Sequence, residues 1–229
     1  MGSKPGRIVA ALLILLLLTG FFYFNPRRSL DDAESIIEST LKRGKKINSY
    51  HFLLEMAFNQ GDETREHFAQ VWYRYPHFFR VELFPYCPEE NSKPDQVIIS
   101  DGEKMWLSSP EMGDFFPLDA GVQELAPTPF LLNNFLDGLA NSRERKFLGI
   151  EKKEKHSYYL LRVVPQDSRR DHAYEEVWLE KRTMLPVQIL VYDQQDKLKQ
   201  RVLFRKTILN AHIPDEFFQI DNKGGTVKQ

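Results

Sequence analysis

"ISDGEKMWLSSPEMGDFFPLD", from Ile99 to Asp119, holds an Asp-Gly pair between two short apolar runs. Asp101-Gly102 separates "QVIIS" from "KMWLSS" and predicts an antiparallel hairpin, because glycine readily adopts the positive φ of a tight turn. The second run and the residues after it carry several large apolar side chains. This apolar surface must lie in a core, in a ligand cavity or against a partner.

The segments on both sides of this hairpin alternate between apolar and polar residues with a period of two. "YHFLLEMAFN" places Tyr50, Phe52, Leu54, Met56 and Phe58 on one face. "REHFAQVWYRYP" and "HFFRVELF" follow, and five more such runs lie between Glu144 and Asn210. This period is typical of strands with one buried face. The pattern predicts an antiparallel α+β domain of about ten or eleven strands.

Two segments have helical spacing instead. "SLDDAESIIESTLKRG" is predicted to be a helix with Ser29 or Asp31 as its N-cap and with basic residues at its end. "PTPFLLNNFLDGLA" is predicted to be a short helix, with Pro129 in its first turn. With so few helices and such long strands, we expect a strongly curved sheet whose concave face is covered by the helices.

Residues 1–28 do not resemble a globular segment. Basic residues flank about 17 uncharged residues from Ile8 to Phe24, a length at the lower limit for crossing a bilayer. Bulky aromatic residues follow Thr19-Gly20, so the segment is predicted to be an uncleaved signal-anchor, with a cleaved signal peptide as the alternative. The charge balance favours an extracytoplasmic body at residues 29–222, followed by a flexible tail at 223–229.

Composition excludes some classes of function. The chain of 229 residues has 31 Lys and Arg against 32 Asp and Glu, which argues against a nucleic-acid partner. Its single cysteine, Cys87, allows no intrachain disulfide and no cysteine metal site. The six histidines lack zinc-site spacing, and no phosphate-loop, dinucleotide or nucleophile-elbow motif occurs. We therefore expect no metal, no cofactor and no enzymatic activity, although a hydrolase assembled from residues distant in sequence stays open.

Four segments in order resemble the LolA-like family of lipoprotein-sorting proteins and carriers. They are "AQVWYRYPHFFRVELF", the opening hairpin stretch, "PTPFLL" and "ILNAHIPDEFFQID". The resemblance implies an incomplete antiparallel β-barrel with helices as a lid over an apolar cavity that binds acyl chains of lipids or lipoproteins. Tyr75 stands where carriers of that family tend to have a basic residue before the proline. With the anchor, this departure favours the membrane-tethered members of spore-forming Gram-positive bacteria.

The resulting hypothesis is a membrane-anchored, extracytoplasmic lipid- or lipoprotein-binding protein that performs no covalent chemistry. The alternative is a structural or regulatory partner in a cell-envelope complex, related to sporulation or germination, with the same fold and a filled core. Which face of each strand points inward is left open. The candidate cavity residues are Phe52, Leu54, Met56, Trp72, Phe79, Val81, Trp106 and Leu107 on strands, and Phe130, Leu131, Phe135 and Leu136 on the lid helix.

Overall fold

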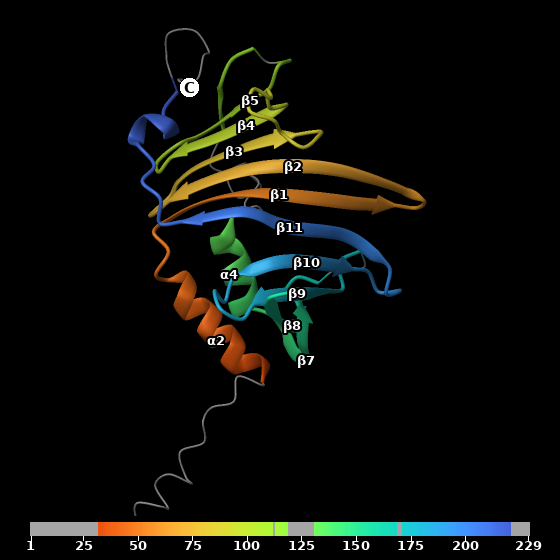
Figure 1. The fold of residues 1–229 in the computed structure, drawn as a ribbon. Helices are drawn as coiled ribbons and strands as arrows, with labels where there is room; N and C mark the ends of the chain where they lie inside the picture. Colours follow the sequence, from red (N-terminus) through yellow and green to blue (C-terminus); the bar gives the residue numbers. More distant parts are fainter. Residues whose placement is uncertain (1–31, 112, 119–130, 169–170, 221–229) are drawn as a thin grey trace, which may run out of the picture.

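The computed structural model describes residues 32–111, 113–118, 131–168 and 171–220. These residues form one antiparallel sheet of eleven strands, in the order β6-β5-β4-β3-β2-β1-β11-β10-β9-β8-β7. Figure 1 shows the sheet curving around two helices. Within the described residues, neighbours in the sheet are also neighbours in sequence except where β1 pairs with β11. The expected α+β class and strand number are confirmed.

The long central strands match the alternating runs of the sequence. The bounds are β1 Ser49–Gln60, β2 Glu63–Arg74, β3 Phe78–Phe84, β4 Gln96–Asp101, β5 Met105–Ser108, β6 Phe116–Leu118, β7 Glu144–Lys153, β8 His156–Val164, β9 Tyr174–Glu180, β10 Pro186–Tyr192 and β11 Leu198–Leu209.

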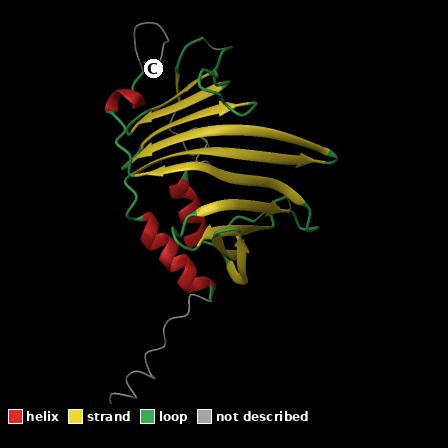
Figure 2. Ribbon diagram, viewed as in Figure 1, coloured by secondary structure: helices red, strands yellow, loops and turns green. Residues whose placement is uncertain are grey.

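Helices α2 (Ala33–Gly44) and α4 (Leu132–Ala140) lie together against the sheet, as Figure 2 shows. The N-cap of α2 is Asp32, whose carboxylate accepts a 2.8 Å hydrogen bond from the amide of Ser35. The cap is therefore neither Ser29 nor Asp31, as the sequence predicted, but the residue after Asp31. Asp32 is the cap because its side chain lies within reach of the first-turn amides. The expected first turn at Pro129 lies outside the described residues.

The Asp101-Gly102 hairpin joins β4 to β5 as predicted. Its turn is wider than a two-residue loop, because Ser100 and Met105 form the last strand pair. Gly102 has a φ of +94°, and the Asp101 carboxylate accepts hydrogen bonds from the amides of Glu103 and Lys104 at 2.9 and 2.8 Å. The aspartate and the glycine therefore act together, one by capping amides and the other by its backbone freedom.

The core has two parts on the face that carries the helices. One part joins β1 to β5 with α4 and includes Tyr50, Phe52 and Leu132. The other joins α2 with β7, β8 and β9 and includes Ile36 and Leu161. We call this helix-bearing side of the sheet the inner face and the opposite side the outer face.

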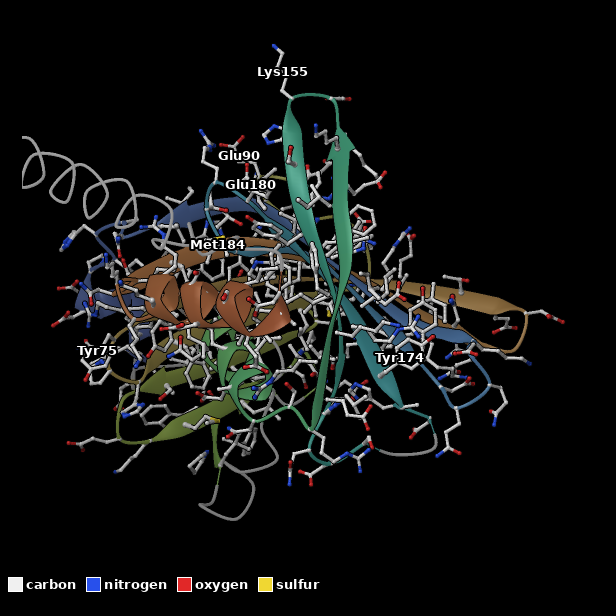
Figure 3. All side chains as sticks on the ribbon, turned by 90° about the horizontal axis from the view of Figure 1, so that it is seen from below. Tyr75, Glu90, Lys155, Tyr174, Glu180 and Met184 are labelled. Atoms are coloured by element: carbon white, nitrogen blue, oxygen red, sulfur yellow. The ribbon has the colours of Figure 1, made fainter. Side chains whose placement is uncertain are left out.

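The outer face is covered at one end by the C-terminal 3-10 helix η2, Asp215–Phe218. Phe218 has no exposed surface, and Phe217 contacts the Trp72 ring with 5.1 Å between ring centroids. At the other end of the sheet, the β7–β8 hairpin extends beyond the body with Lys155 at its tip (Figure 3). The described residues contain no helix long and apolar enough to cross a membrane, and residues 1–31 lie outside them.

Candidate functional site

Residues that lie directly opposite one another in the sheet share a face. The inner face is marked by one such row of six residues on neighbouring strands: Tyr50, Tyr73, Phe79, Ser100, Met105 and Leu118. The phenolic oxygen of Tyr50 accepts a 3.0 Å hydrogen bond from the Leu132 amide, and that of Tyr73 accepts one of 2.7 Å from the Asn133 side chain. These bonds attach the start of α4 to the centre of the sheet.

The two phenols are structural groups. Burial raises the pKa of Tyr50 far above its ordinary value, against the opposing effect of the backbone hydrogen bond to Leu132. Burial also raises the pKa of Tyr73. Both side chains therefore stay neutral and hydrogen-bonded at physiological pH, and neither is suited to exchange protons with a substrate.

Beneath the helices the inner face is filled by side chains. Nine of the twelve candidate residues belong to this core or pack against it: Phe52, Leu54, Met56, Phe79, Val81, Leu107, Leu131, Phe135 and Leu136. Tyr50 stacks on Phe52 with 5.0 Å between ring centroids, and Phe52 meets the Phe204 ring edge-on at 5.3 Å. The structure thus brings these nine candidates together in a packed core.

The inner face opens beyond the helices, toward the β1–β2 turn at Gly61. A groove of about 370 Å³ lies there, and we call it the hairpin groove; its lining residues are Met56, Phe58, Gln60, Arg65, His67 and Leu83. Its volume falls near the lower end of the range of small-molecule sites, about 300–1,000 Å³. Met56 is the one candidate from the sequence that lines it.

Trp72 and Trp106 lie on the outer face. The strand register pairs Trp72 with His51 and Arg80, and it pairs Trp106 with Ile99. Trp106, a candidate cavity residue, borders a hollow of about 310 Å³ beside Gln219 and Ile220 of the C-terminal segment. Successive side chains along a strand lie on opposite faces of the sheet. A tryptophan next in sequence to an inner-face residue must therefore lie on the outer face. Phe130 lies outside the described residues.

Sequence reasoning missed most of the groove. Phe58 and Leu83 continue the alternation of inner-face residues along β1 and β3. The apolar residue at every second position was therefore a signal that could have identified them. Arg65 and His67 had no such signal, because both are exposed polar residues of β2. Their place follows from register: His67 lies opposite Met56, and Arg65 lies opposite Phe58.

A further hollow in the described part of the chain is polar. It measures about 560 Å³ and is lined by Lys155, His156, Ser157, Glu180, Lys181 and Arg182 at the tips of two hairpins. Across the described residues, no group of three or more His, Cys, Asp or Glu side chains is arranged to hold a metal ion. In the hairpin groove, by contrast, the large apolar side chains of Met56, Phe58 and Leu83 form part of the concave surface.

Comparisons with known proteins give the family. The model described as "Sporulation protein YdcC-like" matches residues 6–218. Sporulation protein YdcC of Bacillus subtilis (strain 168) is 22% identical over 202 residues, which make up 86% of this chain and 55% of that protein. The chain thus spans about half the length of this curated relative.

Similar solved structures are more distant in sequence. An uncharacterized conserved protein from Thermus thermophilus is 11% identical, with a TM-score of 0.53 over 84% of this chain and 98% of that one. MucB is 16% identical, with a TM-score of 0.50 over 84% and 64% of the two chains. At such identities the likeness concerns the fold alone.

A LolA superfamily protein, NE2245 from Nitrosomonas europaea, is also among the structural matches. It is 14% identical over 82% of this chain and 98% of that one, and its TM-score of 0.41 carries no weight by itself. The family model, in contrast, covers almost the whole chain. The protein therefore belongs to the YdcC-like family of sporulation proteins.

Proposed function

We propose that this protein binds the acyl chains of lipids or lipoproteins in the hairpin groove and performs no covalent chemistry. The observation that carries the proposal is the groove itself, a concave part of the inner face that is floored by Met56, Phe58 and Leu83. The curved sheet acts as an incomplete barrel, closed by helices at one end and accessible at the other. The LolA-like sequence pattern supports the same class of ligand.

The energetics suit reversible capture. Burying about ten methylene groups would contribute roughly 8 kcal/mol, at about 0.8 kcal/mol each. Association and chain ordering offset several kcal/mol of this gain. The remainder corresponds to a ligand that is held but can be released, as a carrier or sorting protein requires.

We place the protein on the outside of the cell membrane as a single-pass protein. The support is the uncharged segment from Ile8 to Phe24 with its basic flanks. Determining the N-terminus of the mature protein tests this placement, since a start near Phe21 would indicate cleavage. Protease treatment of intact cells tests the orientation, because an external body is digested and a cytoplasmic one is protected.

A second function is favoured by the packing under the helices. Tyr50, Phe52 and Leu54 are almost fully buried, so the described side chains at the centre of the inner face are closely packed. A filled core of this kind suits a structural or regulatory partner in an envelope complex. In that case the groove would be a surface for a protein segment rather than for an acyl chain.

Lipid binding separates the two functions. The full-length protein, purified in mild detergent, is examined by native mass spectrometry and by titration with an apolar fluorescent probe. We expect co-purified lipid and a saturable probe site that Phe58→Ser weakens. The matched control is Phe68→Ser, which alters a half-buried phenylalanine on the outer face of β2. Absence of both lipid and a saturable site would overturn the carrier function and favour the envelope partner.

A further inference from the structure

The polarity of the hairpin groove changes along its length. Met56, Phe58 and Gln60 are alternate residues of β1 that approach the turn, and the groove becomes polar in that direction. Across from them on β2, Arg65 lies opposite Phe58, two residue pairs from the end of the ladder. The groove therefore has an apolar inner end and a polar mouth, which is the layout of a site for an amphiphile.

The residues that line the mouth include basic groups but no carboxylate. Of the six described residues that line the groove, Arg65 is a permanent cation, His67 carries an imidazole, and none is a carboxylic acid. Glu55 and Glu66 alternate onto the outer face of the sheet, where they face Arg201 at 3.5 and 3.9 Å. Glu63 lies on the same face as Arg65 but is not among the residues that line the groove. An anionic group entering the groove therefore meets no lining carboxylate.

The guanidinium of Arg65 is available to a ligand. It pairs with Glu63 at 3.5 Å, and the two side chains are 64% and 74% exposed. An exposed ion pair of this kind contributes little free energy and exchanges easily with solvent. A carboxylate or phosphate would instead accept two parallel hydrogen bonds from the planar guanidinium.

The inner end of the groove is closed by packed side chains. The next inner-face pair after Met56 and His67 is Leu54 with Ala69, and these residues are 1% and 0% exposed. With a volume of about 370 Å³, the groove is at the small end of ligand sites. These dimensions suit one hydrocarbon chain rather than the paired chains of a diacyl lipid.

We propose that the hairpin groove selects single-chain anionic amphiphiles, with the chain on Met56, Phe58 and Leu83 and the anionic head at Arg65. This inference rests on the proposed acyl-chain binding and names its ligand class. The shared chemistry is a carboxylate or phosphate on one alkyl chain, so a fatty acid and an alkyl phosphate are both expected to bind.

Four probes with one chain length test the proposal: palmitic acid, hexadecyl phosphate, the neutral hexadecanol, and the zwitterionic palmitoyl-lysophosphatidylcholine. Each displaces the fluorescent probe from the full-length protein in one fixed concentration of non-ionic detergent. We expect the affinity for the anionic probes to be at least about tenfold higher than for hexadecanol, since a charge-assisted hydrogen bond is worth about 1.5–3 kcal/mol. The ratio between the two anionic probes then tells whether carboxylate or phosphate is preferred.

Arg65→Ala isolates the head-group contact. We expect the variant to lose the preference for anions while its affinity for hexadecanol stays within about twofold of the unchanged protein, because the apolar floor is untouched. Lys152→Ala removes the same charge from the exposed surface of β7 and should retain the preference. Circular dichroism before titration shows that both variants are folded.

Each result bears on the proposal. Equal affinity for palmitic acid and hexadecanol in the unchanged protein overturns the head-group assignment and leaves acyl-chain binding intact. A preference for anions that persists in Arg65→Ala also overturns it. Failure of all four probes overturns the proposed function together with this inference, and tight binding of hexadecanol alone would show a purely apolar site.

Discussion

The hydroxyl of Tyr50, at the centre of the sheet, accepts a 3.0 Å hydrogen bond from the backbone amide of Leu132, in the first turn of α4. The first amides of a helix have no partner within the helix, and Leu131 at the cap position offers no side-chain acceptor. A residue 82 positions away in sequence thus caps the helix. The position of α4 depends on this long-range contact.

Replacing Tyr50 by phenylalanine tests that dependence. The change keeps the ring but leaves the buried Leu132 amide without its acceptor, so we expect a loss of about 1–3 kcal/mol in the free energy of unfolding. Urea denaturation followed by circular dichroism measures it. Tyr158→Phe, at a half-buried outer-face position, is the control and should change stability by less than about 0.5 kcal/mol. Equal effects in the two variants would contradict the capping role.

The close approach of α2 and α4 depends on Gly44. A methyl group on this glycine would collide with a terminal carbon of Leu136. We expect Gly44→Ala to destabilise the protein by about 1–3 kcal/mol, because the packed contact must open. Adding Leu136→Ala should make the alanine at position 44 neutral, since the space it needs is then free.

Gly138 in α4 provides the matched control for Gly44. A Cβ atom there would meet no described neighbour within 4 Å, so Gly138→Ala should leave stability unchanged or raise it by up to about 1 kcal/mol. Thermal unfolding of the three variants measures these effects. A stable Gly44→Ala protein would show that the helices can separate without cost.

Arg80 and Glu82 form a buried ion pair on the outer face, with side chains 8% and 14% exposed. Phe217 covers the guanidinium, with 4.9 Å from its central carbon to the ring centroid. Glu82→Gln should cost about 3–5 kcal/mol, because a buried cation loses its partner charge. Replacing both residues by methionine should cost much less or nothing, since the desolvated charges are removed together.

The exposed pair of Glu63 and Arg65 has the same sequence separation and serves as the control for Glu82. Glu63→Gln should change the free energy of unfolding by less than about 1 kcal/mol, because solvent screens this pair. Chemical denaturation of the variants gives the comparison. Similar costs for Glu63→Gln and Glu82→Gln would show that burial does not govern the stronger pair.

Asp193 predicts a contribution to acid stability. Its carboxylate accepts hydrogen bonds of 2.9 Å from the amides of Lys197 and Gln195, which hold its pKa below the ordinary 3.8 despite the opposing effect of burial. A carboxyl whose pKa is lower in the folded state stabilises the fold above the unfolded value, and the stabilisation is lost as pH falls through the folded value.

Asp193→Asn should therefore unfold with a shallower dependence on pH below about 4. The measurement is the urea midpoint at a series of pH values from neutral to strongly acidic. Asp196, also in the β10–β11 turn, provides a second variant, Asp196→Asn, that keeps these backbone bonds. An unchanged pH slope in Asp193→Asn would show that the turn forms equally well around a protonated carboxyl.

The sequence predicted the elements well where the signal was local. Alternation along β1 grouped the residues from Tyr50 to Phe58 that share one face, and the Asp101-Gly102 pair located the β4–β5 hairpin. Both signals depend on neighbours within a few residues. The cap of α2 was misplaced by one residue or more, because several acidic and hydroxyl residues precede that helix and each is a plausible cap.

The candidate site was predicted less well. Trp72 and Trp106 were grouped with the inner residues because they are large and apolar, yet register places them on the outer face. Most candidates were chosen from the segments richest in apolar residues. In the structure, the apolar side chains of these segments fill the space between the sheet and the helices. The groove lies where the helices end, next to Arg65 and His67, which carry no apolar signal.

By itself, the sequence determined the alternating strands, the central hairpin, the two amphipathic helices and the resemblance to a lipid-carrier family, because each is encoded by residues close together in the chain. The tertiary structure alone decided which face of the sheet is the inner one and which aromatic residues lie on it. It also decided where a groove is left on that face. A strand pattern defines two faces without saying which one is covered. That choice is made by contacts such as Tyr50 with Leu132, which join segments far apart in sequence.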